Sequence, residues 1–140
     1  ISGHSIMQRK ALSRYSSILK IIKLAAEQGF KLVITTDHGM VYVKKPSQVV
    51  GDRETSTNIR YKTGKSLTYD EKDVWAITNP EKLFLPKGNL SSKYIFAKNN
   101  IFLAYPKNYN HFVNYYKDTY QHGGISLEEI IIPISILEPK

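Results

Sequence analysis

The apolar run at residues 31–36, which ends in Asp37, His38 and Gly39, constrains the fold more than any other stretch. The run reads Lys-Leu-Val-Ile-Thr-Thr and is rich in β-branched residues, which favours a short buried strand. Gly39 permits a sharp turn after the strand. Ligands of α/β sheets gather at the carboxyl ends of strands. We therefore expect Asp37 and His38 to project into a site at the end of this strand.

A helical pattern precedes this strand. Apolar residues recur at three- and four-residue steps and predict a helix over residues 13–28. Ser13 or Ser16 is a suitable N-cap, and Gly29 stands where a C-cap glycine belongs. A helix that leads directly into a buried strand is typical of a parallel sheet covered by helices. The expected fold class is therefore α/β.

The rest of the chain alternates short apolar runs with turn residues, and no repeat or linker divides it. We expect a single domain over residues 1–140. The pattern predicts strands at residues 73–77, 94–97, 101–105 and 130–137, a hairpin joining the second and third of these, and a short aromatic helix within residues 108–120.

The segment at residues 49–67 is polar and is bounded by Gly51 and Gly64. A long ordered loop inside a compact domain is usually functional, so we interpret this segment as a polar lobe over the site. The alternative is a disordered surface excursion.

The net charge of +8 favours anionic partners, such as nucleotides, nucleic acid or phosphorylated substrates. The alternative is a solvated lysine-rich surface, because the lysines are dispersed. We expect no membrane span, since no apolar run approaches about 20 residues. The absence of cysteine and of a visible signal peptide fits a cytoplasmic location. Because the chain starts at Ile1, we expect it to be part of a longer protein.

Two of the four histidines, His38 and His122, lie beside glycines at the ends of apolar strands. Imidazole and carboxylate groups are suitable ligands for zinc or manganese. The alternative for Asp37 and His38 is a hydrogen-bonded loop pair without a metal. The sequence contains no Gly-x-Ser-x-Gly elbow and no phosphate-binding glycine-rich loop.

Three motifs resemble the C-terminal portion of a PglZ domain, a family of the alkaline phosphatase superfamily. They are Thr-Asp-His-Gly at residues 36–39, the Gly-Asp-Arg-Glu-Thr segment within residues 50–62, and His-Gly-Gly-x-Ser-x-Glu-Glu within residues 122–133. The resemblance runs from the helix before Asp37 to the end of the chain. The second motif is most similar to PglZ domains fused to the receiver domains of response regulators, so a receiver domain is an expected partner in the parent chain.

The resemblance implies an alkaline-phosphatase-like sheet flanked by helices and a site with two divalent metals, with zinc favoured and manganese the alternative. Asp37 and His38 would bind one metal, and His122 would bind the other. His4 would share the second site, with an Asp of the family's Asp-x-x-x-His pattern lying before Ile1. The alternative for His4 is a flexible N-terminus.

The resemblance also implies hydrolysis of a phosphoester or phosphodiester in a phosphorylated small molecule or nucleotide. Arg53 and Arg60 would contact the phosphate as substrate-binding residues, since arginine favours bidentate contact; a surface charge is the alternative for each. The nucleophile would be a threonine outside this chain, so we expect these 140 residues alone to be inactive. Two further hypotheses stay open: a non-catalytic signalling module that recruits an anionic ligand or protein partner, and a nucleic-acid binder.

Overall fold

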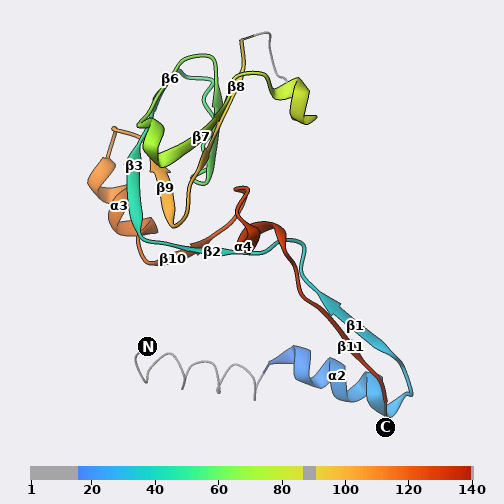
Figure 1. Cartoon of the computed structure of the whole chain (residues 1–140). Coiled ribbons are helices and arrows are strands. Elements are labelled where there is room, and N and C mark those ends of the chain that lie inside the picture. The colour runs from blue at the N-terminus through green and yellow to red at the C-terminus, as the bar shows by residue number, and fades with distance from the viewer. Residues whose placement is uncertain (1–15, 87–90, 140) are drawn as a thin grey trace. The chain divides into compact units, whose positions relative to one another are not determined.

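The computed structural model of the chain describes residues 16–86 and 91–139 and shows a mixed α/β protein with few helices and several small sheets (Figure 1). Its helices are α2 (Ser17–Glu27), α3 (Tyr109–Tyr116) and α4 (Leu127–Ile130), with short 3-10 turns at η1 (Glu71–Asp73) and η2 (Pro80–Leu83). Its strands are β1 (Leu32–Thr35), β2 (Val41–Val43), β3 (Lys45–Gln48), β4 (Val50–Gly51), β5 (Tyr61–Gly64), β6 (Leu67–Thr68), β7 (Val74–Ile77), β8 (Lys93–Ala97), β9 (Ile101–Ala104), β10 (Thr119–Gln121) and β11 (Ile134–Leu137). Within the described ranges, no helix combines the length and apolar character that crossing a membrane requires.

The chain divides into two compact units. Of the described residues, the first unit comprises 16–36 and 133–139, and the second comprises 37–86 and 91–132. In the first unit, the Ser16 hydroxyl accepts a hydrogen bond from the Ile18 amide at 3.2 Å and caps α2. Gly29 follows the helix with a φ of +73°, a conformation that favours glycine. The predicted helix and its Ser16 cap are therefore confirmed.

The strand predicted after this helix is present as β1, but its surroundings differ from the prediction. β1 pairs antiparallel with β11 in a two-stranded ribbon, in the register Leu32↔Leu137 to Thr35↔Ile134 (Figure 1). Val33 on β1 is 57% exposed. The prediction of a buried strand in a parallel sheet covered by helices is wrong for the described residues, because the partner of β1 comes from a segment about 100 positions away. No local pattern specifies such a pairing.

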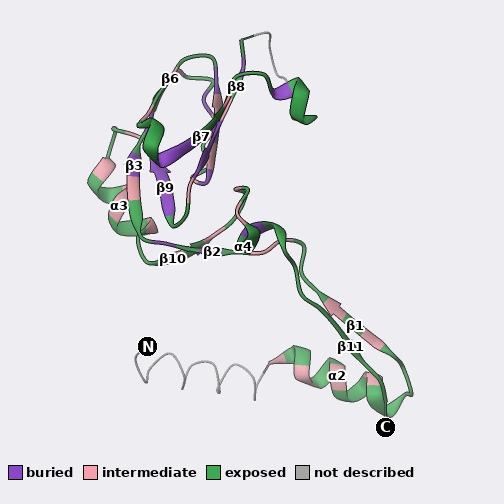
Figure 2. Ribbon diagram, viewed as in Figure 1, coloured by how far each residue is buried: buried purple, intermediate pink, exposed green. Residues whose placement is uncertain are grey.

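The second unit contains the buried core, coloured purple in Figure 2. β8 is the central strand of an antiparallel sheet with β5 and β7, while β3 pairs parallel with β9 and β2 pairs antiparallel with β10. One apolar cluster includes Ile95 and Leu103, and a second includes Val43 and Phe102, all of them buried. The sites described below lie within this second unit.

The strands predicted at residues 94–97 and 101–105 are confirmed as β8 and β9, but the predicted hairpin is wrong. β8 pairs with β5 and β7, whereas β9 pairs with β3, so the two consecutive strands belong to different sheets. Asn99 in the intervening turn has a φ of +46°. A turn-forming sequence therefore changes the chain's direction here without pairing the strands that it joins.

The segment predicted as a polar lobe supplies β4, β5 and part of the core. Val49 is fully buried, and Thr55 lies against Gly51 and Gly64, where an added Cβ would overlap its side chain. Residues 60 and 62 are also buried, although both are cationic. Polar composition predicted a loop because several buried positions of this segment, at residues 55, 60 and 62, carry polar or charged side chains.

The predicted aromatic helix is confirmed as α3. Phe112 and Tyr116 pack against the apolar cluster around Phe102, which agrees with the packing interpretation of these aromatic residues, whereas Tyr115 is exposed. The last predicted strand is shorter than expected, because residues 127–130 form α4 before β11 begins at Ile134.

Candidate metal-binding site

His38 and His122, which are 84 positions apart in the chain, stack on one another. Their ring centroids are 3.8 Å apart and their planes differ by 14°. The pairing of β2 with β10 explains the contact, because Val41 at the start of β2 lies opposite Gln121 at the end of β10. The residue after Gln121 and the residues before Val41 therefore meet at the same end of this ribbon.

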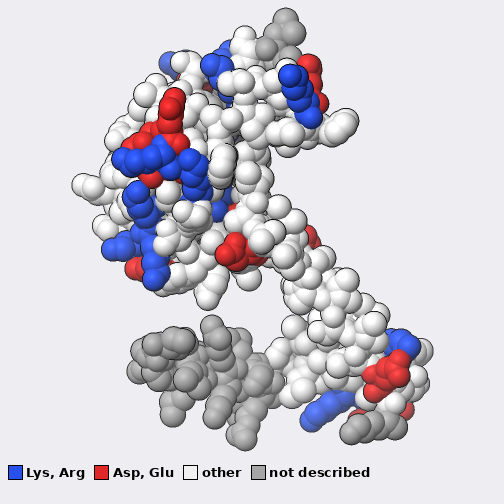
Figure 3. Space-filling view, in the orientation of Figure 1, with Lys and Arg blue, Asp and Glu red and all other residues white. Residues whose placement is uncertain are grey.

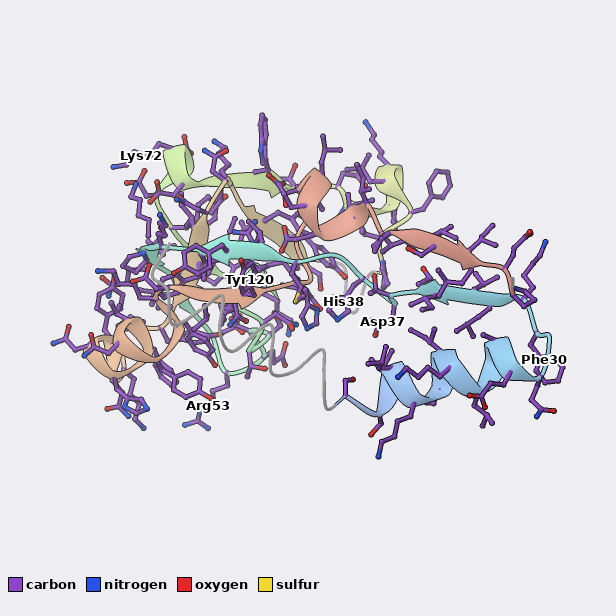
Figure 4. The ribbon with its side chains drawn as sticks, turned by 90° about the horizontal axis from the view of Figure 1, so that it is seen from below. Phe30, Asp37, His38, Arg53, Lys72 and Tyr120 are labelled. Atoms are coloured by element: carbon purple, nitrogen blue, oxygen red, sulfur yellow. The ribbon has the colours of Figure 1, made fainter. Side chains whose placement is uncertain are left out.

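Asp37 lies directly beside His38 (Figure 4). Its Oδ1 is 3.6 Å from His38 Nε2, so the chain turns enough for both side chains to face the same side. The Asp37 side chain is 88% exposed and the His38 side chain is 35% exposed. The structure thus brings together three of the four predicted ligands, two imidazoles and one accessible carboxylate.

A hydrogen bond of His38 determines which of its ring nitrogens carries the proton in the neutral form. His38 Nδ1 is 2.8 Å from the Gly39 carbonyl oxygen. A carbonyl oxygen only accepts, so Nδ1 donates this hydrogen bond and neutral His38 keeps its lone pair on Nε2. Metal-ligating histidines are usually held in this way through their second nitrogen.

Gly39 is required by close packing against the backbone around α4. Its amide donates to the Glu129 carbonyl oxygen at 3.0 Å. A Cβ at this position would overlap the carbonyl oxygens of Glu128 and Ile131. Gly39 does not have a positive φ. The glycine predicted to permit a turn is therefore needed here for close approach, and it joins the His38 turn to the segment after His122.

A buried ion pair supports the same region. The Arg60 guanidinium contacts the Glu129 carboxylate through two hydrogen bonds, from Nε at 2.8 Å and from Nη2 at 2.9 Å, and Nη1 donates to the Ile101 carbonyl oxygen. Both side chains are almost fully buried. Glu129 also accepts from the amides of Gly124 at 3.0 Å and Ser126 at 3.3 Å. One carboxylate thus holds the loop that carries His122, while its own backbone carbonyl holds Gly39.

The protonation of Glu129 follows from these contacts. Burial acts to raise the pKa of Glu129, but the hydrogen bond and positive charge of Arg60, together with the Gly124 amide, favour the ionised form more strongly. The pKa of Glu129 therefore lies below its usual value, and the carboxylate is charged at neutral pH. We expect this pair to be a structural support for the site.

The donor set suits zinc, because it combines imidazole nitrogens with a carboxylate oxygen. The two rings are nearly parallel, with centroids 3.8 Å apart, and the carboxylate of Asp37 lies beside one of them. Within residues 16–86 and 91–139, no group of three or more His, Asp or Glu side chains is arranged to hold a metal. Further ligands would have to join those described.

The other predicted site residues lie in different surroundings. His4 lies outside the described residues. Arg53 is exposed on the turn after β4 and lies apart from Asp37 and His38 in Figure 4, so its substrate contact stays a prediction. Arg60 is fully buried, and contact with a substrate would require its pair with Glu129 to open.

Two buried features were not predicted from the sequence: the pair between Arg60 and Glu129, and the burial of Lys62. The contact between Arg60 and Glu129 joins residues 69 positions apart, and no periodicity signals it. Lys62 is buried on β5, although lysine usually marks an exposed position. For Lys62, the only local signal is the alternation of burial along residues 60–64, which becomes visible once the strand is known.

A comparison with protein families gives a match over residues 3–136 to the family described as the BREX system PglZ alkaline phosphatase-like domain. No curated protein matches the chain. Because the family match covers almost the whole sequence, this chain belongs to the PglZ family, within the alkaline-phosphatase-like, phosphoesterase-type superfamily.

Proposed function

We propose that this chain contributes metal ligands to a phosphoester- or phosphodiester-hydrolysing site centred on His38 and His122. The stack of these two histidines, with Asp37 3.6 Å from His38, is the observation that carries the proposal. The family match supports it, because it associates the chain with alkaline-phosphatase-like domains.

In this proposal Asp37 and His38 hold one divalent cation and His122 holds a second, with zinc favoured and manganese the alternative. Two such cations would supply electrostatic stabilisation of the phosphoryl oxygens and activation of a nucleophile. The chain's own residues orient the donors. Gly39 accepts from His38 Nδ1, and Glu129 holds the loop of His122 through the Gly124 amide.

The remaining parts of the proposed site come from elsewhere. We propose a threonine nucleophile outside these 140 residues, and His4 as a further ligand of the second cation. The substrate class that we propose is a phosphorylated small molecule or nucleotide. Fusion to a receiver domain and a cytoplasmic location also stay proposals, and the BREX context in the family description is the alternative setting.

Hydrolysis of bis-p-nitrophenyl phosphate by the natural full-length protein, with zinc or manganese added, tests this function. We expect metal-dependent turnover that Asp37→Ala abolishes and that His38→Ala or His122→Ala lowers by about 100-fold or more. His111→Ala is the matched control, because His111 is an exposed histidine on α3 outside this cluster. Absence of bound metal together with absence of turnover would contradict the proposal.

One observation favours a non-catalytic binding or signalling module as the second candidate. No complete set of metal ligands occurs in the described part of the chain. Such a module would bind its anionic ligand or protein partner equally well after Asp37→Ala, which separates it from the enzyme.

A nucleic-acid binder is a weaker candidate. Figure 3 shows Lys and Arg side chains on the visible face of the second unit with acidic side chains among them, and not a field of one sign. A nucleic-acid complex would weaken steeply with added salt and would not depend on Asp37.

A further inference from the structure

Lys62 is a buried cation whose charge no acidic group balances among the residues that the structure describes. It lies on β5, opposite Ile95 of β8, and is 1% exposed. Its Nζ is 4.4 Å from the centroid of the Tyr105 ring. Within residues 16–86 and 91–139, this ammonium forms no ion pair with a carboxylate, and its contact is with the face of the Tyr105 ring.

The contact with Tyr105 is a partial compensation for the lost hydration. A cation over an aromatic face is attracted by the ring quadrupole. An ammonium also has three hydrogen-bond donors, which an anion accepts and a ring face does not. The Tyr105 ring is fixed in place, because its hydroxyl donates towards the backbone carbonyl oxygens of Thr55 and Ser56 at 3.2 and 3.3 Å. Burial lowers the pKa of Lys62 to about 8, so most molecules still carry the charge at neutral pH.

Lys62 lines a cavity of about 190 Å³. The cavity walls are largely apolar and aromatic, with Tyr105, Phe112 and Tyr116 among them, and Thr57 adds a hydroxyl-bearing residue. Tyr105 and Phe112 also line an adjoining hollow of about 480 Å³. Pockets for drug-sized ligands measure roughly 300–1,000 Å³, so this cavity suits a smaller molecule.

We propose that this cavity is a binding site for a small aromatic carboxylate, whose negative charge meets the Lys62 ammonium and whose ring lies among the aromatic walls. Lys62 is the one cation in the described lining of the cavity, so a monoanion matches its charge. The apolar lining selects a flat hydrophobic body, because a polyanion such as a nucleoside triphosphate would leave most of its charges unpaired. The site uses none of the predicted metal ligands, so it is separate from the hydrolytic proposal.

Benzoate is the probe for this site, and the measurement is a titration of the ¹⁵N-labelled protein followed by NMR. We expect saturable shifts of the Lys62, Tyr105 and Phe112 amides, with a Kd on the order of 1 mM for so small a ligand. Lys62→Met preserves the length of the side chain and removes the charge, and we expect it to weaken binding at least about tenfold. Lys107→Met is the matched control, since Lys107 is an exposed lysine that lines only the adjoining hollow, and it should leave the Kd unchanged.

Benzamide tests the role of charge without any substitution. It has nearly the same shape as benzoate and is neutral, so we expect at least about tenfold weaker binding. Inorganic phosphate should give no saturable shifts at these amides, because it lacks an apolar body. The proposal is overturned if benzoate causes no saturable shifts, if benzamide binds as tightly, or if Lys62→Met leaves benzoate binding intact.

Discussion

Arg60 and Lys62 are separated by one residue, and both are fully buried, yet their charges have different surroundings. Arg60 contacts Glu129 through two hydrogen bonds and has a further acceptor at Ile101. Lys62 faces the ring of Tyr105 and a cavity, and it forms no ion pair with the residues that the structure describes. The difference suggests that the first cation supports the fold around the histidines, whereas the second is available to a ligand. Removing the partner of Arg60 should therefore destabilise the protein, whereas removing the charge of Lys62 should stabilise it.

The largest effect is expected at the paired cation. Glu129→Ala leaves the Arg60 guanidinium buried without its partner and frees the Gly124 and Ser126 amides, so we expect a loss of about 3–5 kcal/mol in the free energy of unfolding. Urea denaturation measures it. The matched control is Glu128→Ala, next in the chain but exposed, which should change stability by less than about 0.5 kcal/mol. Similar losses for the two variants would contradict the supporting role of the pair.

The pH dependence of this pair has a definite sign. Because the pKa of Glu129 is lower in the folded than in the unfolded state, its contribution is present above the ordinary glutamate pKa. It is lost as the pH falls through the lower folded-state value. We expect the stability difference between the protein and Glu129→Ala to shrink on acidification, as urea midpoints from pH 7 down to the acid limit of folding would show.

At the unpaired cation, Lys62→Met should stabilise the protein near pH 7, because it replaces a buried charge by an apolar chain of similar length. The folded-state pKa of about 8 lies below the ordinary 10.5, so the unfolded state binds more protons between these values and stability rises with pH there. The advantage of Lys62→Met, roughly 3 kcal/mol at most below pH 8, should therefore disappear towards pH 10.5. A constant difference across this range would show that Lys62 keeps its charge compensated.

A smaller effect is expected at Tyr105, which holds its ring beneath Lys62 through its hydroxyl group. Tyr105→Phe keeps the ring and removes the hydrogen bonds to Thr55 and Ser56, so we expect a loss of about 0.5–1.5 kcal/mol. Benzoate binding should weaken by only a few-fold, because the aromatic face remains. Thermal unfolding and the same NMR titration would measure the two quantities, and unchanged stability would mean that this hydroxyl does not fix the ring.

Local patterns predicted the elements well and their pairing poorly. Apolar periodicity and the Ser16 cap located α2, and the aromatic spacing located α3. The antiparallel partner of β1 and the separation of β8 from β9 depend on contacts between distant segments, which periodicity does not encode.

The candidate site was also predicted only in part, because its ligands were selected from the sequence and the contacts that hold them were not. The strand-end argument and the resemblance to PglZ domains selected Asp37, His38 and His122, which the structure brings together. The bound metals that the resemblance implies stay a prediction. The pairing of Arg60 with Glu129 was not predicted, because a buried arginine in a polar segment has the same local signal as a surface charge.

A zinc titration followed by NMR of the imidazole side chains tests whether His38 and His122 bind metal. We expect saturable changes at both rings, a clear loss of zinc affinity in His38→Ala and in His122→Ala, and unchanged affinity in His111→Ala. Zinc that leaves both rings unaffected, or that binds equally well after both substitutions, would contradict it.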